Sequence, residues 1–82
     1  MVSSDGARPQ AMHDDLQSRY ALTPAETEVA MALHGGAALR QIADQRQVSI
    51  NTVRNQVKSA MAKTGVRRQA DLILLVDRQM RG

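Results

Sequence analysis

The sequence contains no cysteine, tryptophan or phenylalanine, and Tyr20 is its only aromatic residue. Without cysteine the chain has no disulfide, and neither His13 nor His34 has a Glu or Cys at metal-ligand spacing. The hydrophobic core must therefore be built from Leu, Ile, Val, Met and Ala. A domain within these 82 residues buries only roughly 60% of its unfolded surface. Association with a second copy is the natural source of further burial.

Long hydrophobic runs are also absent. No apolar run approaches the roughly 18 residues of a membrane-spanning helix, and residues 1–10 lack the apolar core of a secretion signal. With the absence of cysteine, this predicts a soluble cytoplasmic protein without a membrane partner. We interpret residues 1–20 as a flexible leader or linker with a short helical turn near its end. Residues 21–80 are predicted to form one domain.

The elements of an enzyme site are missing as well. Asp14 and Asp15 are adjacent in the leader, which does not create an acid–base pair. The pair Gly35-Gly36 is too short for a phosphate-binding loop and follows no strand. No nucleophile or metal cluster is visible. We therefore expect no catalytic residue, no metal and no cofactor.

Positive charge is concentrated in the second half of the chain. The net charge is +3, but residues 36–82 carry nine basic and three acidic side chains, whereas residues 1–35 carry two basic and five acidic ones. This asymmetry suggests a polyanionic partner on one face. Charge alone is equally compatible with a solvated surface that is unevenly charged by chance.

Local signals predict an all-α domain of four helices. Thr23-Pro24-Ala25-Glu26 combines an N-cap, a first-turn proline and a capping box, so a helix should begin here and end at Gly35-Gly36. A short second helix is expected over about 39–45, followed by a turn through 46–48. We expect Val48 to be buried between the helices on either side of this turn.

The third helix is expected to begin after Ser49, its N-cap residue, and to end at Gly65. Its core-facing positions recur at helical spacing and comprise Val53, Val57, Ala60 or Met61, and Thr64. The opposite face carries the polar residues Asn51, Arg54, Asn55 and Lys58.

The polar face of this helix has the chemistry that reads DNA in the major groove. Arg54 can pair with guanine, Asn55 with adenine, and Lys58 with guanine or a phosphate. Candidate contacts to the DNA backbone are Ser49, Asn51, Thr52, Lys63, Arg67 and Arg68. The alternative is that these are ordinary surface residues; the helix–turn–helix order and the uniformly polar face favour DNA binding.

The fourth helix, about 68–79, is apolar around most of its circumference. Ala70 and the five residues from Leu72 to Val76 are apolar, whereas one stripe would suffice to pack the helix on its own domain. The surplus stripe favours pairing with the same helix of a second copy. The alternative is a central helix that its own domain wraps on all sides.

Taken together, these motifs resemble the LuxR/FixJ-type (GerE-like) helix-turn-helix domain of bacterial transcriptional regulators. The resemblance spans about residues 22–76 and rests on several short matches in the family's order. They are Leu22-Thr23-Pro24-Ala25-Glu26, Gln41-Ile42-Ala43, Val48-Ser49 with Thr52-Val53-Arg54, Lys63-Thr64-Gly65-Val66, and Arg68-Gln69-Ala70-Asp71-Leu72.

The resemblance implies a four-helix domain that dimerises through its last helix and binds an inverted repeat near a promoter, with the third helix (about 50–64) in the major groove. By position it implies base contacts from Arg54, Asn55 and Lys58. It implies backbone contacts from Thr23, Ser49, Thr52 and Lys63. It also implies a dimer surface formed by Leu72, Leu75, Val76 and Gln79.

The chain departs from the family pattern at three places. Gln47 stands where glycine is common, so it should adopt a conformation that glycine takes more easily, at a cost of about 1 kcal/mol. Gln56, a further candidate for the DNA backbone, stands where the family often has histidine. Residues 1–20 are too few to form the sensor domain that usually precedes this module in a longer chain.

The sequence therefore predicts a homodimeric, sequence-specific regulator of transcription whose partner is double-stranded DNA. The alternative is a helix-turn-helix interaction module that controls another regulator or RNA polymerase without reading DNA. The basic face of the third helix distinguishes the two, because only the first function requires it.

Overall fold

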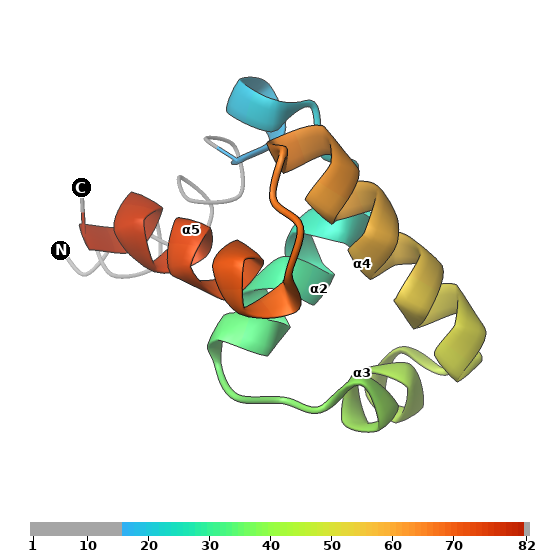
Figure 1. The fold of residues 1–82 in the computed structure, drawn as a ribbon. Coiled ribbons are helices and arrows are strands. Elements are labelled where there is room, and N and C mark those ends of the chain that lie inside the picture. The colour runs from blue at the N-terminus through green and yellow to red at the C-terminus, as the bar shows by residue number, and fades with distance from the viewer. Residues whose placement is uncertain (1–15, 82) are drawn as a thin grey trace, which may run out of the picture.

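The computed structural model describes residues 16–81, and within this range the fold is all-α with no strand. The helices are arranged around α2 (Figure 1). A short helical segment at residues 16–20 precedes them. The four main helices are α2 (Pro24–His34), α3 (Leu39–Arg46), α4 (Ile50–Thr64) and α5 (Gln69–Arg81). The predicted all-α, four-helix class is confirmed.

Helix α2 begins at the predicted capping box. The Thr23 hydroxyl oxygen accepts a hydrogen bond of 3.1 Å from the Glu26 backbone N–H, and the Glu26 carboxylate accepts one of 2.9 Å from the Thr23 N–H. Two of the unpaired N–H groups at this helix end are thereby satisfied. The helix ends at His34, and the chain then turns at Gly36, whose φ of +96° is readily adopted only by glycine.

The turn between α3 and α4 depends on a left-handed residue. Gln47 has φ 57° and ψ 44°, which confirms the prediction for this position. The Gln47 N–H donates a hydrogen bond of 3.2 Å to the Asp44 carbonyl, and the Val48 N–H donates one of 3.0 Å to the Ala43 carbonyl. The expectation that Val48 is buried is wrong, because its exposed fraction is 38%. Ile42 and Val53, both almost inaccessible, occupy the core between the two helices instead.

Helix α2 lies at the centre of the packing, in contact with α4 and α5 as well as α3. Val29 and Ala30 on α2 are fully buried, and so is Leu16 from the segment that precedes the helix. The chain segment interpreted as a leader thus contributes a core side chain. The buried apolar residues form one cluster, which comprises Leu16, Leu22, Val29, Ala30, Leu33, Ile42, Ala43, Val53, Val57, Ala60, Leu72 and Val76.

Helix α5 divides its apolar residues between the core and the surface. Leu72 and Val76 are buried by the chain's own domain, with exposed fractions of 1% and 0%. They have no surface to offer to a second copy, which corrects the expectation that these two residues form a dimer surface. Leu74, by contrast, is 52% exposed. Within the described residues, α5 is therefore not wrapped on all sides.

Candidate nucleic-acid interface

Helix α4 presents two chemically different faces, as the sequence predicts. Val53, Val57 and Ala60 are buried on one side. The other side carries four polar side chains that are all exposed: Asn51, Arg54, Asn55 and Lys58. Helical spacing puts these four on one surface, because residues three or four apart are neighbours on a helix.

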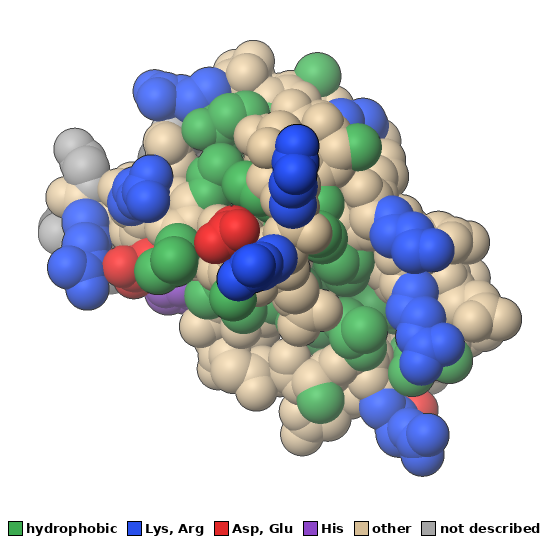
Figure 2. Space-filling model, in the orientation of Figure 1, with side chains coloured by type: hydrophobic (Ala, Val, Ile, Leu, Met, Phe, Trp, Pro, Cys, Tyr) green, Lys and Arg blue, Asp and Glu red, His purple; other side chains and the backbone are tan. Residues whose placement is uncertain are grey.

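The two cations of this face are free to bind another molecule. The side chains of Arg54 and Lys58 form no ion pair or hydrogen bond with the part of the chain that the structure describes. Lys and Arg side chains follow one another along the edge of the molecule formed by α4 and α3 (Figure 2). An unpaired basic edge of this kind attracts a polyanion.

The N-terminal end of α4 adds hydrogen-bond donors. The Ser49 hydroxyl oxygen caps the helix by accepting from the Thr52 N–H at 3.1 Å, and the two hydroxyls lie 2.9 Å apart. The hydrogen bond between the two hydroxyls uses only one of their hydrogens, so the other hydrogen can be donated to a group outside the protein. The remaining N–H groups of the first turn also suit a phosphate oxygen.

Lys63 differs from the other candidate DNA contacts. Its ammonium group lies 2.8 Å from the Glu26 carboxylate, whose side chain is only 7% exposed. Burial by itself raises the pKa of Glu26, but hydrogen bonds from Lys63, Ser59 and the Thr23 N–H outweigh it and lower the pKa to about 2. The carboxylate is therefore ionised and holds the lysine ammonium.

Thr23 and Gln56 are less available than the sequence suggests. The Thr23 hydroxyl oxygen serves the α2 cap, which leaves its hydrogen as the only group that it can offer to a phosphate. Gln56 is half-buried. Its side-chain oxygen is inaccessible to solvent and has no hydrogen-bond partner among the described residues. Its amide NH₂ is the part that remains for an external acceptor.

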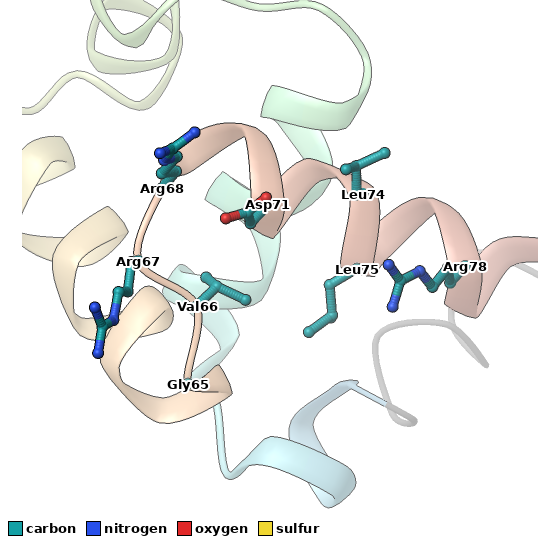
Figure 3. Close-up of a pocket in the computed structure, with 8 residues that line it drawn as sticks. All are labelled: Gly65, Val66, Arg67, Arg68, Asp71, Leu74, Leu75 and Arg78. Atoms are coloured by element: carbon teal, nitrogen blue, oxygen red, sulfur yellow. The ribbon is translucent and has the colours of Figure 1, made fainter.

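Arg67 and Arg68 project from the loop between α4 and α5, beside an open hollow of about 510 Å³ (Figure 3). Val66 from this loop and Leu75 from α5 face each other across it (Figure 3). The hollow is lined by Gly65, Val66, Arg67, Arg68, Asp71, Leu74, Leu75 and Arg78. Neither loop arginine has a partner within residues 16–81.

The exposed cation on α3 was not selected from the sequence. Arg40 on α3 is exposed and has no partner in the described part of the chain. The helical pattern of α3 signalled its exposure, because the buried Ile42 is two residues away and therefore lies on the opposite side of the helix. Motif matching overlooked Arg40 because it belongs to none of the quoted motifs.

The described residues offer neither a metal site nor a membrane-spanning helix. Residues 16–81 contain no group of three or more His, Cys, Asp or Glu side chains that would hold a metal ion. None of the helices described is both long and apolar enough to cross a membrane.

The arrangement of a capped α2, a short α3, a left-handed turn and a two-faced α4 is that of a helix-turn-helix domain. Residues 20–76 match the model of the family described as "Bacterial regulatory proteins, luxR family". The chain belongs to the LuxR family. No curated protein and no solved structure gives a significant match.

This match confirms the resemblance predicted from the motifs. It shows that the chain is a helix-turn-helix DNA-binding regulator. Regulators of this family act by binding DNA and not by catalysis. The match includes α2, α3 and α4 completely and ends at Val76, within α5. The buried Leu16 lies outside the matched residues.

Proposed function

We propose that this LuxR-family protein binds an inverted-repeat operator as a homodimer, with α4 of each copy in the major groove. The observation that carries the proposal is the outward face of α4, where four polar side chains are exposed and the two cations are unpaired. The major groove of B-DNA admits one α-helix and displays a different pattern of donors and acceptors for each base pair.

Three side chains of α4 are proposed to contact bases. The Arg54 guanidinium can donate two hydrogen bonds to the O6 and N7 atoms of a guanine, and the Asn55 amide can form a matching pair with adenine. Lys58, one turn further along the same face, reaches a guanine or a phosphate. All three are exposed in the free protein, so binding displaces water and not protein contacts.

The backbone contacts are proposed to surround this face. Ser49, Asn51 and Thr52 lie at the N-terminal end of α4, where free N–H groups and a hydroxyl hydrogen suit phosphate oxygens. Arg67 and Arg68 in the following loop, together with Arg40 on α3, provide unpaired positive charge for the flanking phosphates.

The proposed dimer contact lies on α5. Leu75 and Gln79 remain half-exposed after Leu72 and Val76 are assigned to the core, and the 52% exposed Leu74 lines the same hollow as Leu75. The hollow beside Leu75 can receive side chains of a second copy (Figure 3). Two-fold symmetry of the protein would then match the inverted repeat of the operator.

The test is selection of bound duplexes from a random DNA pool by the wild-type chain and an Arg54→Ala/Lys58→Ala variant. We expect an enriched inverted repeat with the wild type and none with the variant. Arg81→Ala is the matched control, because Arg81 is 80% exposed at the end of α5, away from α4 (Figure 1). It should enrich the same repeat.

Two results would contradict the proposal. Enrichment of the same sequence by the Arg54→Ala/Lys58→Ala variant would show that this face of α4 does not read bases. Only weak, salt-sensitive binding by the wild type, without enrichment, would instead favour control of another regulator, or of RNA polymerase, through protein contacts.

A further inference from the structure

Glu26 is a buried carboxylate that joins the start of α2 to the C-terminal half of α4. Its side chain is 7% exposed and accepts hydrogen bonds of 2.9 Å from the Thr23 N–H and 2.8 Å from the Lys63 ammonium. The Ser59 side chain also lowers the pKa of this carboxylate. A buried charge is tolerated when several donors compensate it, as they do here.

The two α4 partners of Glu26 occupy one side of that helix. Ser59 and Lys63 are four residues apart, so they lie one above the other. The exposed residues Arg54 and Lys58 lie on a different side of α4. A contact that fixes the side facing α2 therefore also fixes the direction in which the outward face points.

Rotation of α4 would be costly for DNA recognition. Successive residues of a helix are about 100° apart, so slippage of α4 by one position would turn Arg54 and Lys58 away from the groove. Apolar packing of Val53 and Val57 is non-directional and tolerates small rotations. Hydrogen bonds and the ion pair at Glu26 are directional and do not.

We propose that Glu26 is a positioning residue for DNA recognition: through Lys63 and Ser59 it sets the rotation of α4 on α2, and Lys63 consequently neutralises no phosphate. This inference rests on the proposed function, because it concerns the same helix and the same DNA. It reassigns Lys63 from the set of backbone contacts to the internal support of α4.

Salt dependence separates the two roles for Lys63. Each neutralised phosphate contributes about 0.9 to the slope of log affinity against log salt concentration. With the selected operator, we expect Lys58→Met to reduce that slope by about 0.9 if Lys58 contacts a phosphate. Lys63→Met should leave the slope unchanged. It should nevertheless lower the ratio of operator to random-sequence affinity roughly tenfold, comparable to a mismatched base pair.

A conservative variant tests whether the ion pair is responsible. Lys63→Arg keeps a cation with several donors and should retain most of the sequence preference. Because Lys63→Met leaves an unpaired buried carboxylate, the Glu26→Gln/Lys63→Met variant removes that charge as well. Circular dichroism should show that this double variant folds. We expect it to have the wild-type salt slope and the reduced sequence preference.

Two outcomes would overturn the inference. A slope reduced by about 0.9 in Lys63→Met, with sequence preference intact, would make Lys63 a phosphate contact. An unchanged slope and unchanged preference in the folded double variant would show that the Glu26 contacts do not position α4. If the wild type itself enriches no sequence, the proposed function fails, and the inference with it.

Discussion

At the scale of single residues, the most informative position is Gln47. It adopts the left-handed conformation that normally favours glycine, with φ 57°. The side chain is exposed, and its backbone N–H ends α3 by bonding to the Asp44 carbonyl. The strain in this turn therefore comes from the presence of a Cβ atom and is relieved if that atom is removed.

We expect Gln47→Gly to raise the free energy of unfolding by about 0.5–1 kcal/mol, because glycine adopts this conformation without steric cost. In a domain of this size, the thermal midpoint should rise by roughly 2–8 °C. Thermal unfolding followed by circular dichroism provides the measurement. Gln45→Gly, two residues earlier within α3, is the control and should lower the midpoint. A lower midpoint for Gln47→Gly would contradict the assignment of strain.

A second prediction at this scale concerns how the stability of the fold depends on pH, and it follows from Glu26. Its pKa is about 2 in the folded protein, below the ordinary value of 4.5. Because the folded state binds the proton less readily than the unfolded state, the stabilisation is fully present above about pH 5 and is lost as the pH falls toward about 2. The contribution is on the order of 3 kcal/mol.

Denaturant unfolding at a series of pH values measures this effect. The wild type should lose stability below about pH 5, and Glu26→Gln should lose clearly less over the same interval. Asp77 has a lowered pKa too, mainly through its hydrogen bond with His34, so it adds to the loss in both proteins. Parallel pH profiles for the two proteins would contradict the role given to Glu26.

At the scale of elements, the short helical segment at residues 16–20 is more closely attached to the domain than its sequence suggests. Its polar composition gave no sign of a core contact, but Leu16 is completely buried in the main apolar cluster. The segment is joined to α2 through Ala21, which has a left-handed φ of 58°. A bend at Ala21 lets the short helix return to the core.

Leu16→Ala should therefore destabilise the domain by about 2–5 kcal/mol, the usual cost of truncating a buried leucine. Chemical denaturation measures the loss. Ser18→Ala, at an exposed position of the same segment, is the matched control and should change stability by less than about 0.5 kcal/mol. A similar small effect for both variants would mean that residues 16–20 are dispensable for the fold.

At the scale of the whole molecule, the question is whether two copies associate through α5. Leu74 and Met80 are both exposed apolar residues of this helix, at 52% and 49%. Six positions separate them, so they lie on different sides of α5. Only Leu74 adjoins the hollow and the half-exposed Leu75.

We expect Leu74→Asp to shift the protein from dimer to monomer, because it places a charge in the proposed apolar contact. Light scattering over a range of concentrations measures the mass, and Met80→Asp is the matched control that should leave it unchanged. Equal masses for the wild type and both variants would exclude this face as the dimer contact. Dissociation only by Met80→Asp would place the contact on another side of α5.

Several features of this protein were predictable from the sequence because their physical causes are local. The capping box at Thr23 and Glu26 acts over three residues, and the alternation of faces on α4 follows from helical periodicity. The left-handed turn at Gln47 follows from the resemblance to a pattern that has glycine there. Together with the ordered motifs, these signals were sufficient for the four helices and the LuxR family.

Other features were decided by packing between residues far apart in the sequence. The bond between Lys63 and Glu26 joins residues 37 positions apart, so no local pattern reveals that this lysine is paired with a buried carboxylate while Lys58 remains free. The apolar run in α5 likewise predicts a helix without saying which side α2 will cover. The sequence by itself determined where helices begin, end and carry polar faces, because those forces act within a turn or two. Only the tertiary structure decided which side chains were left for a partner, because that depends on how each helix is rotated against the others.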